Sequence, residues 1–411
     1  MSLSITLDWD RADEVKTPEL RETWCRLRVS VDGAVASLVR QRNSPHVIRE
    51  SLDVSAYPLA EWIALNWWAL ATSSHVPSFA GVKLSDAGDG FPWPPLRLRS
   101  DRSQMWATLD PFIDESAQVE FLSRISTVLD SEETLLELTR FVDATVRRLD
   151  EAAITGTLLQ DEWAEIRRAS AEEREFATVA AAWGFDPYSM DEHVEQLLLQ
   201  ANATLGDSTL LAEFARTGDL SSLPKAEAWL NAAAARSFAP RQHALIETAV
   251  EPVRSIHDTV PWREGYKRAR ALREALGLSW SERAPVDDLV EVVSLATAPP
   301  TNVDALVRTN SMMTGAIVAP HLHAHSQRFL AARAIARRST ETGYGVSLLT
   351  RESGYSDKVE RAFAAEFLAP AQGISELLGG DFGEDSQLQV ATALGVSPLV
   401  ISHQISNQLA A

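Results

Sequence analysis

The pattern of apolar and polar residues near the N-terminus predicts a short antiparallel hairpin. Every second residue from Cys25 to Val31 is apolar, which is the period of a strand with one buried face. Asp32-Gly33 follows, a dipeptide typical of two-residue hairpin turns. We therefore expect residues 34–39 to return as the partner strand.

A helical pattern begins at Tyr57, where apolar residues recur every three or four positions as far as Leu70. Pro58 stands in the first turn, where its missing N–H is not needed. Residues 96–99 alternate again and predict another strand. We expect residues 1–110 to form a small mixed α/β unit.

Tryptophan is concentrated in this N-terminal range. Seven of the twelve tryptophans in the chain lie there: Trp9, Trp24, Trp62, Trp67, Trp68, Trp93 and Trp106. Such side chains either fill a small core or anchor a ligand or partner at a surface. We expect most of them to fill the core, with Trp68 exposed because it lies off the helical stripe.

Residues 111–255 are expected to form a helical region. Ser131 is the expected N-cap of its first long helix, and Asp186-Pro187 and Gly206-Asp207 are expected breaks. Further helices are expected at residues 161–184, 190–203, 208–217, 222–236 and 240–250. A stack of helical hairpins fits this pattern.

Residues 256–411 are expected to form a third unit. An amphipathic helix is predicted from Gly265 to Gly277, and another begins at Pro285. An apolar strand is predicted at residues 315–319, followed by a helix at residues 328–337 and a second helix at residues 362–368 that Pro370 ends. The expected fold class is α+β and predominantly helical.

The last two helices carry the most informative motifs. Residues 328–337 read R-F-L-A-A-R-A-I-A-R, and residues 363–370 read F-A-A-E-F-L-A-P. With Leu272 to Gly277 and Pro285 to Leu289, this frame resembles the ImmA/IrrE-type zinc metallopeptidases over roughly residues 261–409. The resemblance implies a zincin-like module in which the first helix carries H-E-x-x-H and the second supplies a third zinc ligand.

The residues needed for zinc chemistry are replaced in this chain. Arg333 and Arg337 stand at the two histidine positions and Ala334 at the position of the catalytic glutamate. An arginine side chain stays protonated and has no lone pair for a metal, and alanine cannot accept a proton from water. These replacements predict that hydrolysis at this position is lost.

Arg333 and Arg337 are four residues apart and share one helix face. Two buried positive charges would be costly unless they are paired. We expect carboxylates of the second helix, Asp357, Glu360 and Glu366, to pair with them, with Asp357 at the position of the third zinc ligand. The alternative is that both arginines are solvated on an exposed face.

His321, His323 and His325 form an H-x-H-x-H pattern just before the altered helix. Alternating histidines on a strand can hold a metal on one face, although exposed loop histidines are more common. No metal or other cofactor is expected; zinc at these histidines, with Asp357 or Glu366, is the alternative to be tested.

The C-terminal segment, residues 386–409, has the pattern of a helix-turn-helix. Its second helix offers Ser402, His403, Gln404, Asn407 and Gln408 to a groove but no lysine or arginine. Phosphate contacts supply much of the affinity for DNA, so nucleic acid is an unfavoured partner.

Composition supports a soluble, globular, cytoplasmic protein. The chain has 411 residues, a net charge of −19 and one cysteine, Cys25, which lies in the first predicted strand and is expected to be buried and inert. No apolar run approaches the length of a membrane span, and no leader is visible, so no membrane partner is expected. The acidic balance opposes non-specific binding to nucleic acid and anionic lipid.

These observations favour a catalytically inactive, peptidase-like binding or regulatory protein that acts through a protein partner. In the resembled family the usual activity is cleavage of a transcriptional repressor, so a transcriptional regulator is the partner that the resemblance suggests. A zinc endopeptidase with a rebuilt metal site and a DNA-binding transcriptional regulator are the alternatives.

Overall fold

In a computed structural model, the chain packs into two compact units, Met1–Asp191 and Glu192–Ala411. The structure describes residues 2–409 except 73–80, 102–103, 117, 219, 239–242, 311–312, 341–344 and 353. The boundary falls inside residues 111–255, the range expected to be one helical region. Each unit has its own apolar core, the first from residues 3–181 and the second from residues 249–401.

Unit 1 contains three small antiparallel sheets. Their orders are β1-β2-β3 with β6 beside β2, β10-β11-β4-β5, and β12-β9-β8-β7. The strands are β1 Leu3–Trp9, β2 Trp24–Val31, β3 Ala34–Val35, β4 Val39–Gln41, β5 Ser44–Arg49, β6 Leu52–Ser55, β7 Val82–Lys83, β8 Arg97–Asp101, β9 Gln104–Leu109, β10 Phe112–Asp114, β11 Val119–Phe121 and β12 Ile125–Asp130.

Helices pack against these sheets in unit 1. The long helix α4 contacts β1, β9 and β12, and α2 contacts both α4 and α5. The helices are α1 Pro18–Glu22, α2 Tyr57–Leu65, α3 Trp67–Ala71, α4 Ser131–Glu151, α5 Leu158–Arg168 and α6 Ala171–Ala182, with a 3-10 turn η1 at Leu84–Ala87.

The N-terminal hairpin is confirmed at its turn but not along its whole length. Asp32 and Gly33 both have positive φ, as the tight turn requires. The return strand β3 ends at Val35, because the chain then crosses to the second sheet as β4. Cys25 is fully buried, as expected.

The expectation that tryptophans fill the unit 1 core is confirmed, but the expectation for Trp68 is wrong. None of the seven is exposed, and Trp68 keeps only 8% of its surface. The helix breaks at Asn66, so α3 begins a new helical phase and turns Trp68 inward. The expectation for Trp68 was wrong because the apolar stripe was drawn as if residues 57–70 formed one continuous helix.

The start of the expected helical region is also corrected. Three strands, β10, β11 and β12, occupy its first part; β10 pairs with β11, β11 with β4, and β12 with β9. The cap of α4 is Asp130 rather than Ser131, since the Asp130 carboxylate accepts from the backbone N–H of Glu133. The helix expected at residues 161–184 is two helices, α5 and α6, separated at Ala169 and Ser170, whereas the helices after it lie close to their expected ranges.

Unit 2 is built on one four-stranded mixed sheet of order β13-β15-β14-β16, in which β13 and β15 are parallel. The strands are β13 Glu291–Ser294, β14 Val303–Asn310, β15 Met313–Val318 and β16 Gly345–Thr350. β15 lies at the strand position expected from residues 315–319.

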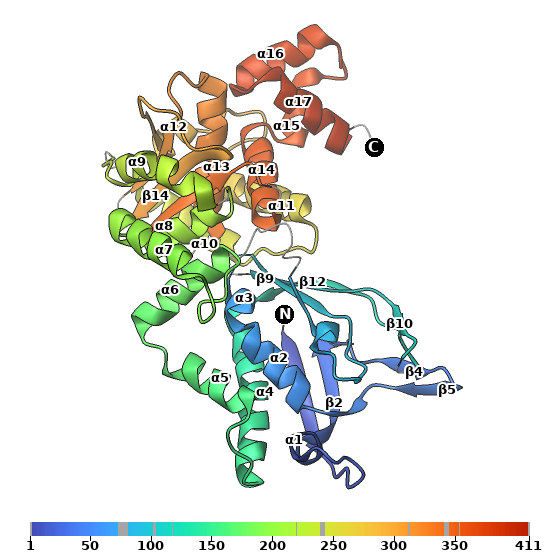
Figure 1. The fold of residues 1–411 in the computed structure, drawn as a ribbon. Helices are drawn as coiled ribbons and strands as arrows, with labels where there is room; N and C mark the ends of the chain where they lie inside the picture. Colours follow the sequence, from blue (N-terminus) through green and yellow to red (C-terminus); the bar gives the residue numbers. More distant parts are fainter. Residues whose placement is uncertain are drawn as a thin grey trace. The chain divides into compact units, whose positions relative to one another are not determined.

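Helices surround this sheet (Figure 1). Helix α13 packs on the sheet, α14 packs on α13 and α11 packs on α14, while α8 contacts β16 and α9 contacts β14. The helices are α7 Glu192–Leu205, α8 Ser208–Ala215, α9 Leu223–Ala234, α10 His243–Arg254, α11 Pro261–Ala275, α12 Val286–Leu289, α13 Ala324–Thr340, α14 Tyr355–Leu368, α15 Ala371–Leu378, α16 Glu384–Leu394 and α17 Pro398–Gln404, with short turns η2 Leu220–Ser222 and η3 Ile405–Leu409.

Helices α11 and α14 approach each other closely at Gly265. A Cβ added there would lie 2.5 Å from the carbonyl oxygen of Val359 and 2.7 Å from the Cβ of Ala362. Only glycine therefore allows the two backbones to meet at this distance. On another side, α14 packs on α13.

The α+β class with helices predominating is confirmed. Within the described residues, no single helix combines the length and apolarity of a membrane span. One bent pair, Glu384–Leu394 with Pro398–Leu409, has that length and composition across a 109° bend.

Candidate functional site: a buried arginine–carboxylate network

Helix α13 places Arg333 and Arg337 on the face toward α14. Four residues separate them, so they lie one turn apart, and they are 2% and 1% exposed. Ala334 points elsewhere and is fully buried in the apolar core. The two guanidinium groups therefore occupy the interior between the helices, where each positive charge needs a partner.

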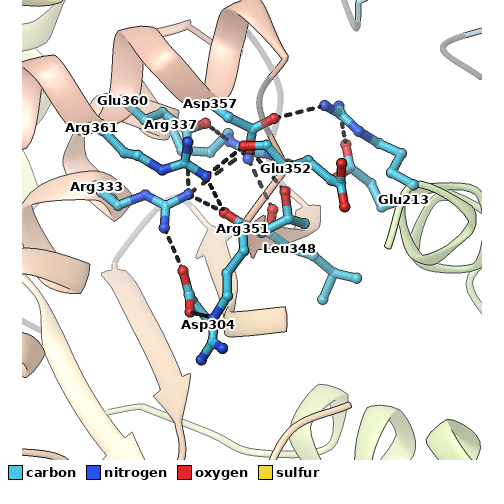
Figure 2. Close-up of polar contacts among 12 residues, drawn as sticks. Glu213, Asp304, Arg333, Arg337, Leu348, Arg351, Glu352, Asp357, Glu360 and Arg361 are labelled. Atoms are coloured by element: carbon cyan, nitrogen blue, oxygen red, sulfur yellow. Dashed lines mark hydrogen bonds and ion pairs between the residues drawn. The ribbon is translucent and has the colours of Figure 1, made fainter. Parts of the chain in front are cut away.

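Glu360 of α14 supplies the shared partner (Figure 2). Its carboxylate accepts from Arg337 Nε at 2.6 Å and from Arg333 Nη2 at 3.4 Å, and it is 1% exposed. Arg337 also donates to the carbonyl oxygen of Leu348 at 2.9 Å. The expected ion pairing between the two helices is confirmed for Glu360, and the solvated alternative is wrong.

Asp357 lies one turn before Glu360 and is fully buried. It accepts from Arg216 Nη2 at 3.2 Å and from the Thr350 hydroxyl at 2.9 Å. Arg333 Nη2 lies 3.9 Å away, within ion-pair range. Asp357 therefore pairs with Arg333 as expected, but its closer cation comes from the end of α8.

Asp304 on β14 joins the network from the sheet. It accepts from Arg333 Nη1 at 2.9 Å and from Arg351 Nε at 2.8 Å. The Glu213 carboxylate of α8 also forms ion pairs, at 3.8 Å with Arg337 and at 4.0 Å with Arg216.

The ion-paired side chains balance in charge. Among the ion pairs of the described residues here, four arginines, Arg216, Arg333, Arg337 and Arg351, face four carboxylates, Glu213, Asp304, Asp357 and Glu360. A neutral, hydrogen-bonded set avoids the large cost of an isolated buried charge. The set cross-links α8, α13, α14 and the sheet.

Arg361 lies beside this balanced set and is bound differently. Its guanidinium donates to the backbone carbonyls of Thr350, at 3.1 Å, and Glu352. Burial, together with the neighbouring positive charge of Arg333, lowers the pKa of Arg361 from its ordinary value. Arg361 thus carries a positive charge that adds to an already neutral network.

The expected role of Glu366 as a partner of Arg333 and Arg337 is wrong. Six residues after Glu360, it points about 120° away around α14, because an α-helix turns about 100° per residue. Its carboxylate instead accepts from Arg270 at 2.7 Å, Gln404 at 2.8 Å and Gln408 at 2.7 Å. Glu366 therefore ties α14 to α11 and to the C-terminal helices.

A cleft of about 700 Å³ borders the network between α11, α13, α14 and α17. Its apolar lining is formed by Trp262, Tyr266, Leu322, Phe329, Leu330, Ala362, Ala365, Leu368, Val396, Leu399 and Val400. Its charged lining is formed by Asp304, Arg333, Arg351, Lys358 and Arg361. A cleft of this size with a few polar groups has the dimensions of a ligand site.

The three histidines precede and begin α13 rather than lying on a strand. His321 and His323 are exposed, and the His323 and His325 rings lie edge to face with centroids 4.8 Å apart. Partial burial and the neighbouring His323 lower the pKa of His325, which also lines the cleft. In the described parts of the chain, no group of three or more His, Cys, Asp or Glu side chains is placed to hold a metal ion.

The C-terminal helices α16 and α17 turn at Gly395, in the left-handed conformation expected of a helix-turn-helix. His403 and Gln404 of α17 and Asn407 of η3 line the cleft, and Ser402, His403 and Asn407 stay exposed. Gln404 is 1% exposed and is bonded to Glu366 and to the carbonyl of Ala369. This residue, expected to be available to a groove, is engaged within unit 2.

Sequence reasoning did not find Arg216, Asp304 or Arg361. Arg216 lies 141 residues from Asp357, and Asp304 lies 29 residues from Arg333. Such pairings carry no local signal in one sequence. Arg361 did have a local signal, because it directly follows Glu360 in the second site helix.

Comparison with known proteins adds no family to this geometry: no family model matches the chain, and a search of curated proteins finds no match.

Proposed function

We propose that unit 2 is a non-catalytic, peptidase-like module that binds and regulates a protein partner. The observation that carries the proposal is the balanced network at Arg333, Arg337 and Glu360, which stands where the resembled family would hold zinc. The cytoplasm, expected from the sequence, is the compartment we propose for it.

The network opposes hydrolysis for chemical reasons. A zincin needs two neutral imidazoles as ligands and a carboxylate that takes a proton from water. Arginine offers only protonated donors, and Ala334 is enclosed in the apolar core. The Glu360 carboxylate already accepts from two guanidinium groups, so a metal would have to displace both.

The cleft beside the network supports a binding role. Its walls come from four helices, and its lining is mainly apolar with a few charged groups. Two large apolar side chains at this cleft, Trp262 and Leu399, are 56% and 63% exposed. Exposed apolar surface at a concave site is typical of protein–protein recognition.

A transcriptional regulator is the first partner to test, because the resemblance to repressor-cleaving peptidases suggests that class. A module that grips such a protein without cutting it would act by sequestration. This proposal needs neither a bound metal nor contact with DNA.

Metal content and hydrolysis of the purified chain test the non-catalytic part of this proposal. After incubation with zinc and dialysis, elemental analysis is expected to find essentially no zinc. Hydrolysis of unfolded casein is expected to be absent with or without added zinc. An active zinc peptidase is carried through the same dialysis as a control for loss of metal.

One tightly held zinc per chain, with casein cleavage that a chelator abolishes, would overturn the proposal and favour a rebuilt peptidase site. In that case His321, His323 and His325 would be replaced first.

A further inference from the structure

The cleft of unit 2 is lined by more positive than negative side chains, although the chain as a whole is acidic. The whole chain has a net charge of −19, yet the charged side chains that line the cleft are four cations and one anion, Asp304. Partial burial lowers the pKa of His325, which disfavours its charged form. An acidic chain that presents a basic cleft repels acidic groups over most of its surface and attracts them locally.

Two of these cations form no ion pair with a described carboxylate, although Asp357, Glu360 and Asp304 act on Arg361 from farther away. Arg333 and Arg351 both pair with Asp304. Arg361 donates only to backbone carbonyls, and Lys358 is exposed with no ion pair to a described carboxylate. Lys358 and Arg361 both belong to α14, so their positive charges lie on one wall of the cleft.

The remaining lining is suited to apolar side chains. Phe329, Leu330, Ala362 and Ala365 come from α13 and α14, and Leu399 and Val400 come from α17. A small inorganic anion would leave this surface uncovered, whereas a peptide segment can cover it with apolar side chains. Asn407 and Ser397 on the same walls offer polar groups to a peptide backbone.

We infer that the cleft takes a segment of a protein partner in which a carboxylate stands beside bulky apolar residues. The carboxylate pairs with Arg361 and Lys358, and the apolar side chains cover the surface between α13 and α17. This inference rests on the proposed function and adds the chemistry that selects the partner.

Selection from a displayed library of random dodecapeptides on the immobilised full-length chain tests the inference. Peptides that carry Asp or Glu next to bulky apolar residues are expected to be enriched over the unselected library. The best peptide is then synthesised, and its affinity is measured by fluorescence anisotropy at several salt concentrations. Affinity is expected to fall as salt rises, because salt screens ion pairs.

Charge variants locate the carboxylate. Lys358→Glu is expected to lower the affinity about twofold to fivefold, the size of an exposed ion pair. Arg361→Gln is expected to lower it about tenfold, the size of a charge-assisted hydrogen bond. The matched control is Lys225→Glu, an exposed lysine on α9 that does not line the cleft, and its effect is expected to be negligible.

The outcomes separate the inference from the proposed function. If peptides are enriched without acidic residues, or if Lys358→Glu behaves like Lys225→Glu, the inferred chemistry is wrong while peptide binding stands. If no peptide is enriched, both are contradicted. Lys358→Glu replaces an exposed side chain, so it reports on binding even if Arg361→Gln unfolds the module.

Discussion

A buried arginine is stable only when its charge and its donors are satisfied, and Arg337 meets this demand through Glu360 and the Leu348 carbonyl. Arg337→Met keeps much of the volume but removes the guanidinium closest to the buried Glu360 carboxylate. Breaking a buried pair from one side costs about 3–5 kcal/mol. We expect a loss of this size in the free energy of unfolding, measured by urea titration.

The matched control for Arg337→Met is Arg351→Met. Arg351 pairs with Asp304 in the same network, but its side chain is 69% exposed. Exposed pairs contribute about 0–1 kcal/mol, so this variant should stay close to the unchanged chain. Equal effects of the two variants would show that the network is not buried in solution.

Cys25 gives a second test at this scale. Burial, with smaller contributions from Asp53 and Asp8, raises its pKa from 9.0 to about 12. The native thiol should therefore resist a thiol-reactive disulfide reagent at pH 8 and react with one equivalent in urea. Because the folded state holds the proton more tightly, this contribution to stability is full below pH 9 and is lost as pH rises toward 12.

The pairing of Arg333 and Arg337 with Glu360 could be predicted from the sequence, but the other members of the network could not. The spacing of Arg333 and Arg337 and the nearby Glu360 predict a pair of facing helices, because helical periodicity is local information. Arg216 and Asp304 could not be predicted, since only the folded sheet brings β14 and the end of α8 to the same point. The presence of arginines on one helix and carboxylates on the next does not identify which carboxylate pairs with which arginine. Glu366 is the example, since it pairs with Arg270 instead.

At the scale of elements, the contact between α11 and α14 depends on one glycine. Gly265→Ala places a methyl group against the backbone of α14, at 2.5 Å from the Val359 carbonyl. Overpacking of this kind costs about 1–3 kcal/mol. We expect the melting temperature to fall, measured by circular dichroism at the helical signal.

Gly345→Ala is the comparison for that variant. Nothing lies within 4 Å of a Cβ added at Gly345, and its φ is not in the left-handed region. The change should be neutral or slightly stabilising, because alanine loses less backbone entropy on folding. A similar destabilisation at both positions would argue against the close helix approach.

Element prediction from the sequence works best for long periodic segments. Helices α7 to α10 and strand β15 lie near their expected ranges. Strands β10 to β12 were missed, although Val119 and Phe121 alternate with Glu120 and both are buried. β10 and β11 have three residues each, too few for a clear period, and the partners of β11 and β12 lie earlier in the chain, in β4 and β9.

At the scale of the molecule, two separate apolar cores predict two independently folding fragments. Residues 1–191 and 192–411 should each show a cooperative urea transition by circular dichroism when expressed alone. The full chain, measured under the same conditions, provides the reference. A fragment that gives only a gradual, non-cooperative change would show that its core is incomplete without the other.

The balanced network also has a consequence for the order in which unit 2 assembles. Docking α13 on the sheet buries Arg333 and Arg337, and this step is unfavourable until Glu360 and Glu213 arrive with α14 and α8. A partly assembled intermediate would hold buried charges without partners. The transition state for folding should therefore already contain segments more than a hundred residues apart, which makes unit 2 a slow folder for its size.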